Sequence, residues 1–153
     1  MSNLVSMLFA VVDSDVWDAS QVSEWAKRLS ARLDRPKDWL NELRTCTSTE
    51  ICLGLIRRVM NENGMVLPSD IGELMAGLTL LAFDDGRLSA DEARAQLVDI
   101  IDAYGAAFVD AEAAGSLALD DKIYSEMRAR AEDCIRYLTG EQLVEVERGF
   151  LEA

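Results

Sequence analysis

The chain has 153 residues, half of them hydrophobic, and carries 28 acidic against 15 basic side chains, for a formal net charge of −13. It has no histidine, which excludes the usual Ser-His-Asp and Cys-His nucleophilic sites and removes the commonest zinc ligand. A charge of this sign repels nucleic acid and anionic lipid and attracts basic proteins, so we expect a basic protein partner, no nucleic acid and no membrane.

The negative charge is concentrated in the second half of the chain, because residues 1–76 carry a net charge of −3 and residues 77–153 carry −10. The length fits one domain over residues 1–153, and no linker, low-complexity tract or repeat divides it. The N-terminus lacks the basic segment and cleavage site of a secretory signal, and no apolar run reaches the roughly 20 residues of a membrane-spanning helix. These features predict a cytoplasmic protein. For the acidic charge taken by itself, ordinary solubility is the favoured explanation and a charge suited to a basic partner is the alternative.

Apolar residues recur every three or four positions along most of the chain, which predicts an all-α fold, a single compact bundle of about seven helices. The first predicted helix carries a stripe from Leu4 to Val12. The other helices of the first half are identified by residues that typically begin or end a helix. One is capped by Ser20 and runs to about Leu33, and a short one has Pro36 in its first turn. A third begins at Thr47 or Ser48 and ends at Gly64.

The second half opens with a helix after Asp70, which its almost continuous apolar character predicts to be the most buried. A turn containing Gly86 follows, and Ser89 with Glu92 forms a capping box at the start of the next helix. The inward residues of this helix run to Phe108, with an interruption at Gly105, and a break is predicted at Ala113–Ser116. A further helix is predicted from Asp120 or Asp121 to Gly140. A short last helix carries Leu143, Val146 and Phe150.

The turn before Ser89 resembles the end of the calcium loop of an EF-hand, because Asp85, Gly86, Leu88 and Glu92 have the matching offsets. The first two ligand positions would then fall on Leu81 and Phe83, which have no side-chain oxygen. The sequence therefore predicts a capped turn and no metal site.

Carboxylates are the remaining candidates for catalysis. Asp99 and Asp102 have the three-residue spacing that places two carboxylates on one helical face, as in the helical nucleotide pyrophosphohydrolases that bind magnesium. A second pair of this kind is missing, so a solvated helix face is the favoured interpretation. Gly72 and Gly77 lie inside a helical pattern without a following Lys-Ser or Lys-Thr, so no phosphate-binding loop and no cofactor is predicted.

Cysteine and tryptophan are interpreted as core residues. Cys46, Cys52 and Cys134 are odd in number and lie among apolar residues, which predicts reduced buried thiols, with a structural disulfide or a metal site as the alternatives. Trp17, Trp25 and Trp39 are expected to anchor the first helices on the core, with an aromatic recognition patch as the alternative.

The leading functional hypothesis is a non-catalytic, acidic protein-binding module. In composition alone the chain resembles the immunity proteins that neutralise basic bacterial nuclease toxins, and this resemblance implies an acidic surface that occludes a basic active site. The candidate surface consists of six side chains: Asp84, Asp85, Asp99, Asp102, Asp110 and Glu112. Two alternatives are a helical scaffold that pairs with a second copy through Leu4, Leu8 and Phe9, and a magnesium-dependent phosphohydrolase that uses Asp99 and Asp102.

Overall fold

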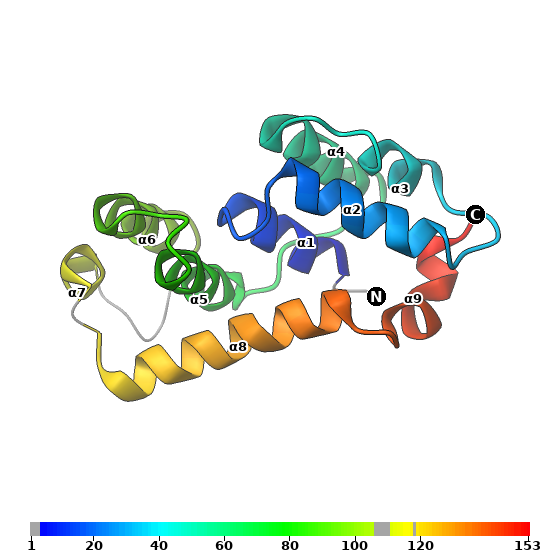
Figure 1. Cartoon of the computed structure of the whole chain (residues 1–153). Helices are drawn as coiled ribbons and strands as arrows, with labels where there is room; N and C mark the ends of the chain where they lie inside the picture. Colours follow the sequence, from blue (N-terminus) through cyan, green and yellow to red (C-terminus); the bar gives the residue numbers. More distant parts are fainter. Residues whose placement is uncertain (1–3, 106–110, 118) are drawn as a thin grey trace. The chain divides into compact units, whose positions relative to one another are not determined.

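The computed structural model describes residues 4–105, 111–117 and 119–153, and within these ranges the chain forms nine α-helices and no strand (Figure 1). Seven of these helices have at least seven residues, so the all-α prediction is confirmed. By their internal contacts the residues fall into two compact units. Unit 1 comprises Met1–Asp13, Trp17–Val66 and Ile135–Ala153, and unit 2 comprises Ser14–Val16 and Leu67–Cys134. The single domain over residues 1–153 stays a prediction.

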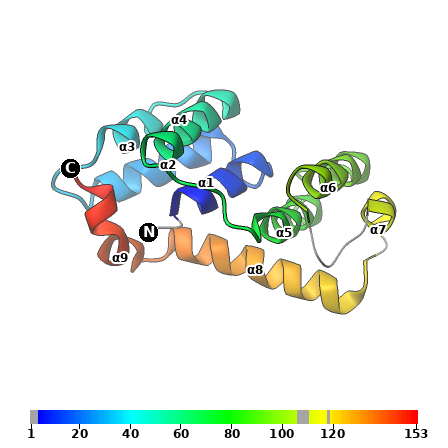
Figure 2. The ribbon, with the colours of Figure 1, turned by 180° about the vertical axis from the view of Figure 1, so that it is seen from behind.

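Unit 1 is built from the first four helices and the last one. Their bounds are α1 (Leu4–Asp13), α2 (Ala19–Ser30), α3 (Asp38–Leu43), α4 (Thr49–Glu62) and α9 (Leu143–Leu151). Helix α1 packs against α4, and α2 packs against α3 (Figure 2). Eight of the ten residues of α1 are buried, which is why α1 has an apolar character all round.

The apolar side chains proposed for pairing with a second copy are part of this core. Leu4 and Leu8 are fully buried and Phe9 is 3 % exposed, with the Arg57 guanidinium over its ring. The expectation of spare apolar surface on the first helix was therefore wrong, because α4 covers it. In the part of the chain that the structure describes, no helix has both the length and the apolar character needed to cross a membrane.

All three tryptophans belong to unit 1. Trp17 and Trp25 are buried and their rings lie 6.2 Å apart, which confirms the predicted anchoring role for both. Trp25 also donates a hydrogen bond from Nε1 to the carbonyl oxygen of Leu138, at 2.8 Å. Trp39 is half-buried and lies 5.7 Å from the ring of Phe150. The aromatic residues thus connect the start of the chain to its end.

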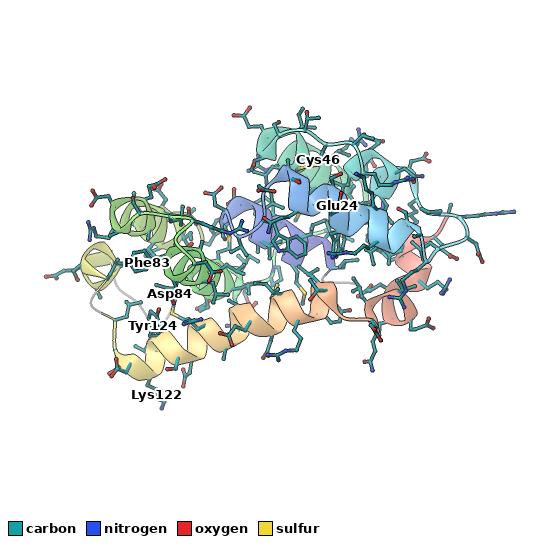
Figure 3. The ribbon with its side chains drawn as sticks, viewed as in Figure 1. Glu24, Cys46, Phe83, Asp84, Lys122 and Tyr124 are labelled. Atoms are coloured by element: carbon teal, nitrogen blue, oxygen red, sulfur yellow. A yellow bond between two sulfur atoms is a disulfide. The ribbon has the colours of Figure 1, made fainter. Side chains whose placement is uncertain are left out.

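The cysteine prediction was wrong for two of the three residues. Cys46 and Cys52 form a disulfide across the loop between α3 and α4, with Cα atoms 5.8 Å apart (Figure 3). The helix start at Ser48 folds the loop back, so that two residues six positions apart face each other. Cys134 is a free, buried thiol, and burial raises its pKa to about 12, so it is the inert core thiol that was predicted.

The helix caps of unit 1 follow local sequence signals at α4 and, with a different residue, at α2. Helix α3 begins at Asp38, so the prediction that placed Pro36 in its first turn was wrong, and Lys37 at its N-cap makes no side-chain hydrogen bond. Helix α2 is capped by Asp18 and not by Ser20, because Asp18 forms a reciprocal capping box with Gln21. Ser48 caps α4 as predicted. The predicted stop at Gly64 is also confirmed, since this residue has a φ of 61° and the amide of Met65 donates to the carbonyl of Met60.

Unit 2 contains α5 (Ile71–Asp84), α6 (Ala90–Tyr104) and α7 (Ala111–Ser116), with α6 beside both α5 and α7 (Figures 1 and 2). Helix α8 (Asp121–Thr139) contributes its residues up to Cys134 to this unit. Eleven of the fourteen residues of α5 are buried, in agreement with the prediction for this helix. A Cβ atom on Gly77 would lie 2.2 Å from the carbonyl oxygen of Met127, so α5 and α8 are in backbone contact there.

The predicted turn between α5 and α6 is present. Gly86 has a φ of 77°, and the amide of Arg87 donates to the carbonyl of Ala82, which closes the end of α5. Ser89 and Glu92 form the capping box of α6. Helix α6 ends at Tyr104, and Gly105, with a φ of 77°, is the interruption that was predicted. Its predicted extension to Phe108 lies outside the described residues.

The last two helices begin and end near the predicted residues. Asp120 accepts hydrogen bonds from the amides of Lys122 and Ile123 and so caps α8, which ends one residue before Gly140. Within unit 1, Tyr137 donates to the carboxylate of Glu147 at 2.5 Å. Glu147 is only 8 % exposed, so this hydrogen bond holds a buried acidic group.

Candidate functional site

The negative charge of the chain belongs almost entirely to unit 2. This unit contains 16 acidic and 5 basic residues, a net charge of −11, whereas unit 1 contains 12 acidic and 10 basic residues, a net charge of −2. The two units together give the −13 of the chain. The negative charge is therefore divided unevenly between the two units.

The basic side chains of unit 2 are mostly neutralised within it. Arg130 pairs with Asp70, and Arg94 pairs with Asp91 on the same helix. Arg128 bridges Asp84, at 3.0 Å, and Glu132, at 3.2 Å. Lys122 projects from the start of α8 and makes no ion pair with a described residue (Figure 3). Few cations are therefore left to screen the remaining carboxylates.

A series of exposed carboxylates lies on α6. Ala93, Leu97 and Ile100 face the core of unit 2, and the opposite side of the helix is exposed. Four acidic residues lie on this exposed side, within about 100° of one another around the helix axis, and we call them the acidic row: Asp91, Glu92, Asp99 and Asp102. At 1.5 Å per residue the row extends over about 15 Å.

Two further carboxylates extend the acidic row at the start of α6. Asp85, at the end of α5, is exposed and makes no ion pair with a described residue. Asp15 belongs to the short segment Ser14–Val16 of unit 2, and its pKa is raised by desolvation of its carboxyl group and by the nearby charge of Glu92. Hydrogen bonds from Ser89 lower the pKa of Glu92 itself, so Glu92 stays ionised.

The structure brings together only part of the predicted surface. Asp99 and Asp102 are exposed in the second half of α6, and Asp85 lies near its start, about 20 Å away along the helix. Asp84 is held by Arg128 and accepts a hydrogen bond from Tyr124 at 2.5 Å (Figure 3), so it is the least available of the set. Glu112 is exposed on α7, next to α6, and Asp110 lies outside the described residues.

Asp91, Glu92 and Asp15 were missed as surface residues in the sequence analysis. Asp91 and Glu92 could have been found from the sequence, because they lie seven to eleven positions before Asp99 and Asp102 on the same helical face. Glu92 was interpreted only as a capping residue in the sequence analysis, so it was not considered as part of a surface. Asp15 could not have been found, because its proximity to Glu92 depends on the fold.

The two ends of the acidic row have opposite effects on the stability of α6. Asp91 and Glu92 lie in the first turn, where the partial positive charge of the helix end stabilises a carboxylate. Asp102 lies in the last turn, where that charge is negative, and no basic residue of α6 is there to compensate. Asp102 therefore interacts unfavourably with the C-terminal end of its own helix.

Neutralising these two positions should change stability in opposite directions. We expect Asp102→Asn to raise the free energy of unfolding by about 0.5 kcal/mol, because it removes a negative charge from the C-terminal turn. Asp91→Asn, the same change at the other end of the same helix, should lower it by about 0.5 kcal/mol. Urea unfolding at low salt followed by circular dichroism measures both, and equal changes of one sign would contradict the electrostatic explanation.

Among the residues it describes, the structure places no third metal ligand beside Asp99 and Asp102, the pair considered as a magnesium site. Within residues 4–105, 111–117 and 119–153, no group of three or more Cys, Asp and Glu side chains is placed to hold a metal ion. Both carboxylates are exposed on α6, as the solvated-face interpretation expects.

Comparison of the chain with models of protein families, with curated proteins and with solved structures finds no match. The functional argument therefore depends on the residues and geometry given above.

Proposed function

We propose that this chain is a non-catalytic binding protein that recognises a basic protein partner through the acidic row of α6. The observation that supports the proposal is the segregation of charge, since unit 2 holds −11 of the net −13. An immunity-type inhibitor that occludes the active site of a basic toxin or nuclease is the form of this function that we favour, because such active sites are built to receive phosphates.

The acidic row suits a partner surface with several Lys or Arg side chains. Asp99 and Asp102 are exposed, make no ion pair with a described residue, and project from a helix that is fixed against α5. A rigid row of carboxylates loses little conformational entropy when a partner binds. The surrounding negative potential accelerates encounter with a cationic protein, and this acceleration weakens as salt screens it.

The test begins with capture of partners from the native host at roughly 50 mM NaCl, where electrostatic attraction is little screened. The baits are the tagged full chain, Asp99→Asn/Asp102→Asn, and the control Glu24→Gln/Glu50→Gln. The control neutralises two exposed carboxylates of unit 1 and so changes the net charge equally. We expect a basic protein to be retained by the wild type and the control and depleted with the α6 variant.

The captured protein is then purified and its dissociation constant is measured by titration calorimetry. We expect the α6 variant to bind about tenfold more weakly, a loss of about 1.4 kcal/mol, and the control to bind within about twofold of the wild type. Affinity should also fall when NaCl is raised from roughly 50 to 300 mM. Capture of no basic protein, or equal weakening by both variants, would overturn the proposal.

A further inference from the structure

A pocket of unit 1 combines an apolar floor with two arginines, and we infer that it binds a small amphipathic carboxylate, an apolar chain that ends in one carboxylate group. The pocket has a volume of about 350 Å³ and lies where the last turn of α2 meets the link from α8 to α9. This volume is at the small end of the range of about 300–1,000 Å³ of small-molecule sites.

The floor of the pocket is formed by buried apolar side chains. Trp25, Leu29 and Leu138 line it, and their exposed fractions are 2, 5 and 1 %. The hydrogen bond from Trp25 Nε1 to the carbonyl oxygen of Leu138 fixes the indole ring in place. The indole N–H is thereby satisfied, so the floor is apolar and already ordered, and an alkyl chain would contact the small part of these side chains that stays accessible.

Arg28 and Arg32 line the same pocket, one helical turn apart in sequence. Arg28 makes no ion pair or hydrogen bond with any residue that the structure describes. Arg32 donates to the backbone carbonyl oxygen of Glu141 at 2.8 Å, an acceptor without a formal charge. Neither guanidinium is therefore neutralised by a carboxylate of the described part of unit 1.

Two other arginines of unit 1 show the contrast. Arg58 contacts Glu42, at 2.6 Å, and Glu62, at 3.8 Å, and Arg148 contacts both Glu145 and Glu152. Arg35 and Arg57 also make no ion pair with a described residue, so what distinguishes Arg28 and Arg32 is that both line one pocket with an apolar floor. Arg28 also lies in the last turn of α2, where it favours the helix, but Lys27 is there as well.

The charges that line the pocket indicate a monoanion. Arg28 and Arg32 contribute two positive charges and Glu141, which also lines the pocket, contributes one negative charge. A guanidinium group binds a carboxylate through two parallel N–H donors, and two such groups can share one carboxylate. The apolar floor then accommodates the chain to which the carboxylate is attached.

Decanoate is the probe for this site, and decanol is its uncharged match. Titration calorimetry of the full chain should give saturable binding of decanoate, with decanol at least about tenfold weaker. In spectra of the arginine side chains, the Nε–H signals of Arg28 and Arg32 should shift on addition of decanoate. Circular dichroism verifies that each variant below is folded.

Two variants locate the site. Arg28→Gln/Arg32→Gln should weaken decanoate binding at least about tenfold, because it removes both guanidinium groups. The control Arg35→Gln/Arg44→Gln removes two positive charges of unit 1 that do not line the pocket, and it should bind within about twofold of the wild type. The inference is overturned if decanoate does not bind up to about 1 mM, if decanol binds equally well, or if both double variants weaken binding alike.

Discussion

Replacing Gly77 by alanine is expected to destabilise the protein by about 3 kcal/mol, because the new Cβ atom would lie 2.2 Å from the carbonyl oxygen of Met127 and 3.3 Å from Cβ of Ala131. The obstacle is the backbone of α8, which cannot move away by changing a side-chain rotamer. In a chain of this size the loss corresponds to a fall in Tm of about 10 °C. Thermal unfolding followed by far-ultraviolet circular dichroism measures it.

Gly54→Ala is the matched control, because Gly54 also lies inside a helix and has no atom within 4 Å of its Cβ position. There the change should stabilise the protein by about 0.5–1 kcal/mol, since alanine is the better helix former. A Gly77→Ala protein as stable as Gly54→Ala would contradict the close contact between α5 and α8.

Tryptophan fluorescence adds a second observation to the same experiment. Trp17, Trp25 and Trp39 all belong to unit 1, whereas Gly77 belongs to unit 2. If residues 1–153 unfold as one cooperative domain, the Gly77→Ala transition seen by fluorescence will coincide with the transition seen by circular dichroism. Separate transitions would contradict the single-domain prediction.

Tyr137→Phe should lower the free energy of unfolding near pH 7 by about 1–3 kcal/mol, because it leaves the buried carboxylate of Glu147 without the hydroxyl that donates to it. Tyr124→Phe is the control with the same change. The partner of Tyr124 is Asp84, which keeps its ion pair with Arg128 and is more exposed than Glu147, so the loss there should be small. Urea unfolding of both variants makes the comparison, and equal losses would contradict it.

The difference between the wild type and Tyr137→Phe should also depend on pH. Burial, and then the hydrogen bond and charge of Glu147, raise the pKa of Tyr137 to about 12, above the value of about 10 in an unfolded chain. A raised folded-state pKa gives stability that is complete below about pH 10 and is lost as the pH rises toward 12. The advantage of the wild type should therefore shrink in this range. Cys134, whose pKa is also raised, is present in both proteins and cancels in the difference.

Local signals in the sequence were sufficient for most helix ends, but the break predicted at Ala113–Ser116 was wrong, because these residues lie in α7. Ser48, Gly64 and the Ser89–Glu92 capping box act within a few residues, so their roles could be read without knowledge of the fold. The start of α2 was misplaced by two residues because Asp18 and Ser20 are both good caps, and Gln21 completes the box with Asp18 alone.

Features that depend on distant residues could not be predicted. The Cys46–Cys52 disulfide requires the loop to fold back on itself, and the apolar context of both residues favours a reduced thiol equally well. The charge asymmetry was visible in the sequence as a difference between halves. The fold sharpens it from −10 in residues 77–153 to −11 in unit 2. It also shows that Asp84 is paired with Arg128 and Asp91 with Arg94, while Glu92 lies on the exposed side of α6.

The order in which the chain enters its two units limits how they can be studied separately. Unit 1 is assembled from three stretches of sequence and unit 2 from two, and the change from one to the other near the end of the chain falls inside α8, between Cys134 and Ile135. No single cut therefore separates the two units, because their stretches alternate along the chain. To isolate the acidic unit, residues 67–134 would have to be expressed together with Ser14–Val16, joined by a designed linker. The order of the segments in such a protein would differ from that in the natural chain.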